Sequence, residues 1–164
     1  MKHTRTISWH DPKANMRDAA SISGLDYLRT IRAGKREPPP VARLIGYRVA
    51  EVENGFAAFE LEPAEYHYNP FATVHGGIVT TLMDTAMTAC VLPTLEKGYT
   101  CSTVEIKVNF VRSVSEKTGP IRCEARPVHV GKRLATVEAQ VKDTAGNILA
   151  HGISTCSIIR IGPS

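Results

Sequence analysis

The pattern of apolar and polar positions predicts six β-strands along this chain. Two strands come first, at residues 46–53 and 56–62, and Asn54-Gly55 between them is a strong signal for a two-residue hairpin turn. Four more strands follow in the second half of the chain, at about residues 100–112, 120–130, 133–143 and 148–159. Short turns join these last four strands.

Alternation is clearest in the third predicted strand, where side chains of two kinds take turns. The apolar set is Val104, Ile106, Val108 and Phe110, and the polar set is Thr103, Glu105, Lys107 and Asn109. A period of two predicts a half-buried strand with one apolar and one polar face.

A helical period replaces the alternation at residues 75–92, HGGIVTTLMDTAMTACVL. The face expected to enter the core holds aliphatic side chains: Ile78, Leu82, Ala86 and Ala89. Residues 63–74 follow neither period and contain two prolines, so we expect a loop there.

The first forty residues differ from the rest of the chain. Residues 1–20 are polar and have no clear period, whereas residues 24–33 have helical spacing, with Ser23 placed to cap the helix. Three prolines at 38–40 then predict a stiff extended connector. We therefore divide the chain into an N-terminal extension, residues 1–40, and one domain, residues 41–164.

The order of elements predicts an α+β fold. Strands that follow one another through short turns favour an antiparallel sheet, since parallel pairing needs longer crossovers. One such sheet packed on one long helix is the simplest arrangement. It leaves a broad surface or edge uncovered, which self-association would cover.

Charge and composition exclude several classes of protein. The formal charge is +4, and residues 1–40 hold all of the excess, with eight basic and four acidic residues against twelve of each in residues 41–164. A neutral body with few aromatic residues argues against nucleic acid as a partner. No apolar run is long enough for a membrane span, and the start of the chain is too polar for a secretory signal, so we predict a cytoplasmic protein.

The cysteines do not indicate a metal or redox site. The chain has four of them, Cys90, Cys101, Cys123 and Cys156, and no two form a CxxC pair. We expect buried free thiols. The histidines show no metal-ligand spacing either, so the sequence predicts no metal and no cofactor.

The densest polar cluster spans the loop and the start of the long helix: Asn69, His75, Gly76, Gly77 and Asp84. Backbone amides at a helix start have no acceptor within the helix, and glycine lets a substrate approach them closely. Such amides can stabilise an oxyanion. On the residues alone, glycines that merely permit tight entry into the helix explain the pattern equally well, and a single histidine is more often structural than catalytic.

Asp84 lies seven residues after Gly77, so the two share one helix face, away from the predicted core face. Thr81 and Thr88 extend this polar stripe by a turn in each direction. A solvated helix face is the plain explanation. However, apolar neighbours flank the stripe and aspartate is a poor helix former, which favours a general base or nucleophile.

Four segments together resemble one known family. They are Asn69 to Gly77 (NPFATVHGG) with Asp84 nine residues after His75, Thr103 to Phe110 (TVEIKVNF), Gly131 to Ala135 (GKRLA), and Asp143 to Ala150 (DTAGNILA). The segments resemble the hotdog-fold acyl-CoA thioesterases, in particular the phenylacetate-pathway (PaaI-like) branch. The resemblance covers roughly residues 40–160, and Asp84, where related enzymes carry Glu, fits this branch.

The resemblance implies a curved antiparallel sheet wrapped around the long helix, in a dimer or tetramer with active sites between subunits. It implies that the Gly76 amide polarises the thioester carbonyl while Asp84 of the facing subunit attacks the carbonyl or activates water. Asn69 and His75 would position the carbonyl and the Gly76 loop. Thr103 is the closest match to a hydroxyl that orients water, with Ser102 and Thr88 left open.

Other residues are expected to contact the substrate without taking part in the reaction. We expect Gly77 and Thr88 to border the substrate, and the hairpin residues Gly131, Lys132 and Arg133 to meet the phosphates of coenzyme A. A hairpin end that carries two charges for solubility is the alternative. We expect pocket depth to depend on Met83, Met87, Tyr68 and Phe71.

The leading hypothesis is therefore a thioesterase that hydrolyses an acyl- or aryl-CoA to the free acid and CoA. The alternatives are a non-catalytic module that binds acyl-CoA or lipid on the same fold, and a hotdog enoyl-CoA hydratase.

Overall fold

A computed structural model describes residues 1–13 and 20–161 of the chain. The predicted polar segment 1–20 is thus described only in part, because residues 14–19 lie outside this range. Three α-helices are described: α2 (Gly24–Arg32), α3 (Pro40–Ile45) and α4 (Gly76–Val91). Three short 3₁₀ turns are η1 (Glu65–His67), η2 (Leu92–Thr94) and η3 (Glu116–Thr118).

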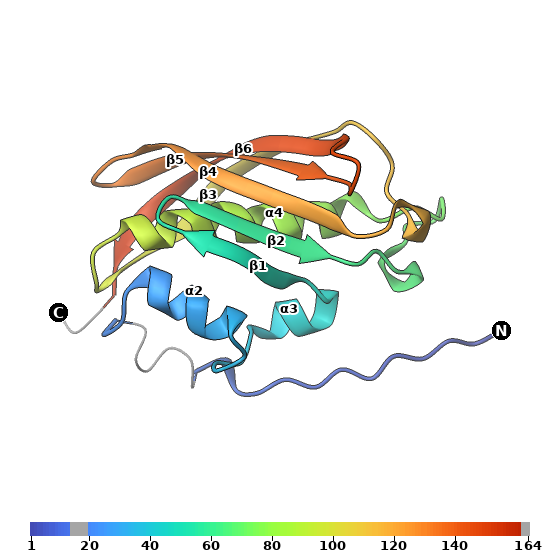
Figure 1. Ribbon diagram of the computed structural model, residues 1–164, viewed down its shortest axis with the longest axis horizontal. Helices are drawn as coiled ribbons and strands as arrows, with labels where there is room; N and C mark the ends of the chain where they lie inside the picture. The colour runs from blue at the N-terminus through green and yellow to red at the C-terminus, as the bar shows by residue number, and fades with distance from the viewer. Residues whose placement is uncertain (14–19, 162–164) are drawn as a thin grey trace.

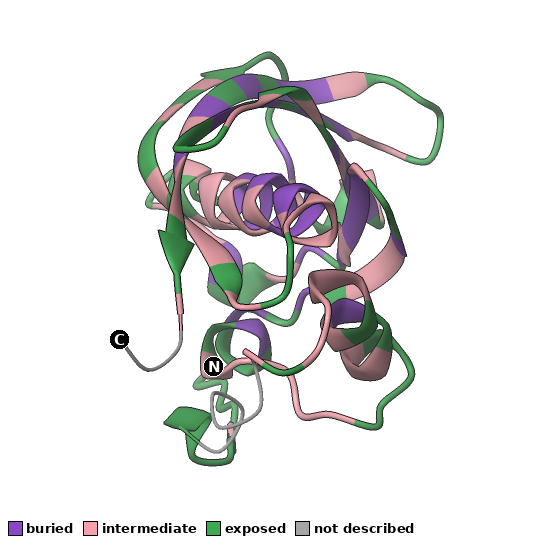
Figure 2. Cartoon of the chain, turned by 90° about the vertical axis from the view of Figure 1, so that its left-hand side faces the viewer, coloured by how far each residue is buried: buried purple, intermediate pink, exposed green. Residues whose placement is uncertain are grey.

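The six predicted strands are all present, and they form one sheet. They are β1 (Arg48–Glu53), β2 (Phe56–Leu61), β3 (Tyr99–Phe110), β4 (Ile121–Val130), β5 (Leu134–Lys142) and β6 (Ile148–Arg160). Every neighbouring pair is antiparallel, in the order β1-β2-β4-β5-β6-β3. The sheet curves around α4 (Figures 1 and 2), so the predicted hotdog fold is confirmed.

Helix α4 buries more of its surface than the sequence predicts. Leu82 and Ala86 are fully buried as expected, but Ile78 is only half-buried. Met83 and Met87, which we expected to set pocket depth, are fully buried in the core instead. A curved sheet contacts a helix on several sides, so a single apolar stripe does not describe the buried face.

The same stretch, Gly76–Thr94, is long and apolar enough to cross a membrane by length and composition alone. The core helix of a globular protein meets the same test. Packing of α4 against the sheet accounts for its apolar character here (Figure 2).

The predicted alternation in β3 is wrong at one point. The pairing of β3 with β6 shifts between Thr103 and Glu105, which marks a β-bulge at Val104. A bulge inserts one extra residue into a strand, so the side chains after it point to the face opposite the one that simple alternation predicts. Val104 is therefore 64% exposed, and Thr103 lies on the same side as Ile106, facing the helix.

Helix α2 of the N-terminal extension packs on the body of the protein beside β1 (Figure 1). Ser23 caps α2, as predicted, with its Oγ accepting from the Asp26 amide at 3.1 Å. The predicted proline connector is shorter than expected, because Pro40 already begins α3. Proline is favourable at this position since the first amide of a helix needs no partner.

Contacts from the start of the chain secure α3. The Arg5 guanidinium donates to the carbonyl oxygens of Leu44, at 2.6 Å, and Arg43, at 3.2 Å. It also lies 4.0 Å from the centre of the Tyr66 ring. These contacts satisfy carbonyl groups at the end of a helix, where no later amide can reach them.

Candidate active site

Asp84 lies in the middle of α4, and its carboxylate points toward β3. The Thr103 hydroxyl donates to Asp84 Oδ1 at 2.6 Å. Both residues are half-buried. A short hydrogen bond to a charged acceptor fixes the carboxylate in one orientation, while its second oxygen stays available to a reactant.

The three candidate hydroxyls lie in different surroundings. Thr103 contacts the Asp84 carboxylate, whereas Thr88 Oγ1 donates back to the helix carbonyls of Asp84, at 3.0 Å, and Thr85, at 3.1 Å. Ser102 is exposed and pairs across the sheet with Ser157. Thr103 is thus the hydroxyl in contact with the acid among the described residues.

The start of α4 is capped by a side chain that binds one of the first backbone amides and leaves another without an acceptor in the described part of the chain. His75 is the N-cap residue, and its Nδ1 accepts from the Gly77 amide at 2.8 Å. The Gly76 amide has no acceptor among the described residues. The Phe110 ring lies against Gly76, where an added Cβ would come within 3.0 Å of Phe110 Cζ. A side chain at residue 76 would therefore contact the Phe110 ring and occupy space beside the free amide.

Asn69 holds the loop before the helix together. Its Oδ1 accepts from the Phe71 amide at 2.8 Å, and its Nδ2 donates to Thr73 Oγ1 at 3.0 Å. The side chain therefore closes its own loop and has no contact with Asp84 among the described residues. Its contribution to a site at the start of α4 is to shape the backbone that leads into His75.

His67 supports the same region and was not singled out by the sequence. It is 3% exposed, its Nε2 lies 2.8 Å from the Ile45 carbonyl oxygen, and its Nδ1 accepts from the Ala64 amide at 3.0 Å. Burial lowers the pKa of His67. Its own carbonyl oxygen accepts from the His75 amide at 2.8 Å. A lone histidine in a loop gives no signal in one sequence that distinguishes such a structural role.

Asp84 and Gly76 do not meet within one subunit. Eight residues separate them on α4, which corresponds to about 12 Å along the helix axis. A thioester carbonyl is far smaller than this distance, so the two groups of one chain cannot act on the same carbonyl.

The hairpin Gly131 to Arg133 lies at the end of the sheet near Thr103. The strand register places Leu134 beside Ser157, and Ser157 beside Ser102. Strands are spaced by about 4.8 Å, so the hairpin is about 10 Å from β3. Lys132 and Arg133 are exposed and form no ion pair among the described residues. The Gly131 amide donates to the Leu134 carbonyl at 2.9 Å, which closes the turn.

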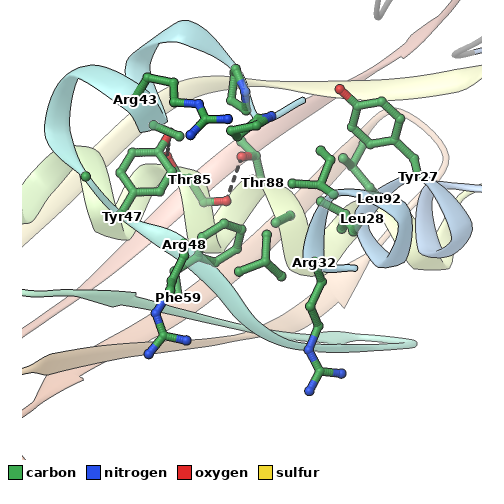
Figure 3. A pocket seen from close by; sticks show the side chains of 17 residues that line it. Tyr27, Leu28, Arg32, Arg43, Tyr47, Arg48, Phe59, Thr85, Thr88 and Leu92 are labelled. Carbon is green, nitrogen blue, oxygen red and sulfur yellow. Dashed lines mark hydrogen bonds between the residues drawn. The ribbon is translucent and has the colours of Figure 1, made fainter. Parts of the chain in front are cut away.

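A cavity of about 490 Å³ opens between α4 and the N-terminal extension (Figure 3). Its walls come from α2, the proline connector, β1, β2 and the last turns of α4. Thr88, expected to border the substrate, lines it, whereas Met83 and Met87 do not. Because the walls come from segments far apart in the chain, sequence patterns did not indicate that residues before position 60 line this cavity.

All four cysteines are free thiols, as predicted, and Cys90, Cys123 and Cys156 are buried, but Cys101 is only half-buried. Burial raises the pKa of the Cys90 thiol to about 12, and burial also raises the pKa of Cys123. Neutral buried thiols are poor nucleophiles. In the part of the chain that the structure describes, no group of three His, Cys, Asp or Glu side chains is arranged to hold a metal ion.

Comparison with known proteins gives matches to thioesterases. The thioesterase superfamily matches residues 71–150. A 1,4-dihydroxy-2-naphthoyl-CoA hydrolase from Listeria monocytogenes serotype 1/2a (strain 10403S) is 29% identical over 114 residues, which are 70% of this chain and 89% of that protein.

Solved structures resemble the fold over most of its length. A phenylacetic acid degradation-related protein from Ralstonia eutropha JMP134 is 26% identical, with a TM-score of 0.72 over 80% of this chain and 98% of that one. A Streptococcus mutans UA159 protein bound to acetyl-CoA is 20% identical, with a TM-score of 0.64 over 71% and 91% of the two chains. The latter likeness concerns the fold alone.

Proposed function

Since this chain is a hotdog-fold thioesterase and thus a thioester hydrolase, we propose that it hydrolyses an acyl- or aryl-CoA to the free acid and CoA. Asp84 is the base or nucleophile, and the Gly76 amide is the oxyanion donor. Residues 41–164 are the hotdog domain and residues 1–40 its extension. The enzyme acts in the cytoplasm.

The observation that carries this proposal is the hydrogen bond from Thr103 to Asp84. A carboxylate fixed by one hydroxyl on a half-buried helix face keeps a free oxygen directed at a reactant. General bases and nucleophiles need this kind of fixed approach, because catalysis depends on orientation as much as on basicity. A solvated helix face would give the side chain no such partner.

The free Gly76 amide supports the second role. An amide at the first turn of a helix adds the positive end of the helix dipole to its own N–H, so negative charge that develops on a nearby oxygen is stabilised. His75 takes up the next amide, that of Gly77, and so leaves one donor directed outward.

Two subunits complete the site in this proposal. The distance of about 12 Å between Gly76 and Asp84 along α4 requires each carbonyl to meet Gly76 of one copy and Asp84 of another. Strand β3 is an edge of the sheet, and its outer backbone groups offer hydrogen bonds to a second copy. Asp84 is hydrogen-bonded to Thr103 of this same edge strand. In a dimer that pairs through β3, the Asp84 carboxylate would therefore lie close to the neighbouring subunit.

In the reaction, the thioester carbonyl oxygen accepts a hydrogen bond from the Gly76 amide. Asp84 takes a proton from a water molecule, and the water oxygen bonds to the carbonyl carbon. The tetrahedral intermediate then collapses, the carbon–sulfur bond breaks, and the CoA sulfur leaves with the proton that Asp84 held. In the nucleophilic variant, Asp84 itself bonds to the carbonyl carbon, the carbon–sulfur bond breaks, and CoA leaves as the thiolate. Water then adds to the resulting anhydride, which releases the acid and the Asp84 carboxylate, and the proton that water gives up goes to the thiolate.

Binding of the CoA portion is assigned to the exposed hairpin. Lys132 provides a point charge and Arg133 a two-pronged donor, which suit phosphate groups. The absence of ion-pair partners among the described residues leaves both side chains available to an anion. Gly131 closes the turn that presents them.

The test is hydrolysis of a panel of aryl- and straight-chain acyl-CoA thioesters, followed by the loss of thioester absorbance. We expect Asp84→Asn to lower kcat about 10²-fold or more while the thermal midpoint stays unchanged. Asp143→Asn is the control, because it makes the same change in the turn between β5 and β6, where Asp143 hydrogen-bonds within the turn and has no contact with Asp84 among the described residues. No turnover of any member by the wild type would overturn the proposal, and an unchanged rate in Asp84→Asn would remove Asp84 from the mechanism. Hydration of crotonyl-CoA in place of hydrolysis would identify a hydratase.

A further inference from the structure

Most of the residues that line the cavity beside α4 precede the segment matched by the family, and helix α2 and the proline connector of the N-terminal extension supply one of its walls. We propose that this cavity receives an apolar, uncharged acyl or aryl group, and that helix α2 sets the size of the group that fits. This inference rests on the proposed function, since it assigns the acyl part of the substrate. A volume of about 490 Å³ is in the range of small-molecule sites.

The cavity begins next to the acid. Thr85 and Thr88 both line it, and Thr88 Oγ1 hydrogen-bonds to the Asp84 carbonyl oxygen. On a helix, residues 85 and 88 lie about 100° and 40° around the axis from residue 84. A carbonyl carbon held at the Asp84 carboxylate thus has its acyl substituent directed along α4 past Thr88.

Helix α2 forms the wall of the cavity opposite the end of α4. Leu92, a lining residue at the start of η2 directly after α4, lies about 12 Å along the helix axis from Asp84. Gly24, at the start of α2, packs so closely there that a Cβ would lie 2.4 Å from the Leu92 carbonyl oxygen. This backbone contact packs the start of α2 closely against η2, the turn that follows α4.

The lining of this cavity is mainly apolar. Leu28 and Ile31 of α2 line it, as do Phe59 of β2 and Leu92 of η2. Leu28, Phe59 and Leu92 are labelled in Figure 3. One polar pair lies among them, where Thr85 Oγ1 donates to the Tyr47 hydroxyl at 3.3 Å. Burial raises the pKa of Tyr47, so the phenol stays neutral.

The arginines at the cavity do not supply a free charge to its interior. Arg43 pairs with Glu37 at 2.7 Å, and Arg48 pairs with Glu60 at 2.5 Å. Arg32 is exposed and points away from the cavity together with Arg48 (Figure 3). A carboxylate at the end of an acyl chain would therefore lose its hydration without gaining a partner, which favours an uncharged group.

Filling the cavity from α2 tests the proposal. Ile31 is half-buried and lines the cavity, so Ile31→Trp reduces its volume, while Arg29→Trp adds the same side chain at an exposed position of the same helix. We expect Ile31→Trp to lower kcat/KM about tenfold or more for decanoyl-CoA and phenylacetyl-CoA, and to leave acetyl-CoA within about twofold. Ile31→Ala should shift the preference toward larger groups, and Arg29→Trp should change neither. For the wild type, glutaryl-CoA should be poorer than hexanoyl-CoA.

A binding measurement separates this inference from the proposed function. Calorimetric titration with the thioether analogue of decanoyl-CoA, which cannot be hydrolysed, reports on the cavity whether or not the protein catalyses hydrolysis. Weaker binding in Ile31→Trp than in Arg29→Trp would support the cavity even if no thioester were turned over. Equal binding in the two variants, or an equal loss of kcat/KM for acetyl-CoA and decanoyl-CoA in Ile31→Trp, would overturn it.

Discussion

Thr103 Oγ1 donates a hydrogen bond of 2.6 Å to Asp84 Oδ1, although simple alternation along β3 assigns Thr103 to the face opposite Ile106. The bulge at Val104 explains this difference. Because the bulge adds one residue to the strand, Thr103 before it and Ile106 after it both face the helix. The irregularity of the strand therefore brings the hydroxyl to the acid.

Removing the Thr103 hydroxyl should slow catalysis without weakening substrate binding. A hydrogen bond to a charged group contributes about 1.5–3 kcal/mol, so we expect Thr103→Val to lower kcat about 10- to 100-fold. KM should change little, because Thr103 acts through Asp84. Steady-state kinetics on the best acyl-CoA of the panel measures this effect.

The conservative variant Thr103→Ser is the control, since it keeps the hydroxyl and should retain most of the rate. Equal rates in Thr103→Val and the wild type would show that the hydrogen bond has no catalytic role. A fall in the thermal midpoint that matches the loss of activity would assign Thr103 to folding instead.

A methyl group at residue 76 should obstruct the proposed oxyanion donor. Loss of one such donor costs about 10²- to 10³-fold in kcat, and we expect Gly76→Ala to fall in this range. The added Cβ would also come within 3.0 Å of the Phe110 ring, which is exposed enough to move aside. Kinetics and thermal unfolding of the variant together separate the catalytic effect from the packing effect.

The double variant Gly76→Ala with Phe110→Ala removes the ring and leaves the methyl group. We expect it to stay slow relative to Phe110→Ala alone. If the double variant recovered the rate of Phe110→Ala, the effect of residue 76 would be packing against Phe110, and the amide would have no role as oxyanion donor.

Local patterns were sufficient for most of the fold. The cap at Ser23, the Asn54-Gly55 turn and the start of α4 at His75 depend on residues adjacent in the chain, and each was predicted within a few positions. Local patterns also singled out the candidate cluster at the start of α4, because free amides and glycines are local features.

Contacts between distant segments could not be predicted in this way. The position of Thr103 depends on one bulged residue, and the burial of Met83 and Met87 depends on how far the sheet curves around α4. The cavity wall depends on α2 meeting Leu92, a contact between residues almost seventy positions apart in the chain. Each of these is a property of the packing, which a period of two or of 3.6 residues does not describe.

Acid should destabilise the protein through His67. Burial lowers its pKa in the folded state, so below the ordinary value of 6.5 the unfolded chain binds more protons than the folded one. The free energy of unfolding is therefore unaffected by the titration of His67 above about pH 6.5. It falls as the pH drops below this value, by at most about 1.4 kcal/mol per pH unit for one proton. Urea unfolding at several pH values between 5 and 8 measures this slope. Because the His67 carbonyl oxygen holds the His75 amide, activity should fall over the same interval.

His67→Gln removes the titration and keeps a side chain that can donate to the Ile45 carbonyl oxygen. We expect this variant to be less stable at pH 7.5 and to have a flatter dependence of the unfolding free energy on pH than the wild type. His129→Gln, at an exposed position of β4, should keep the wild-type slope. An unchanged slope in His67→Gln would show that other groups cause the acid sensitivity, and that the loop before His75 is insensitive to protonation of His67.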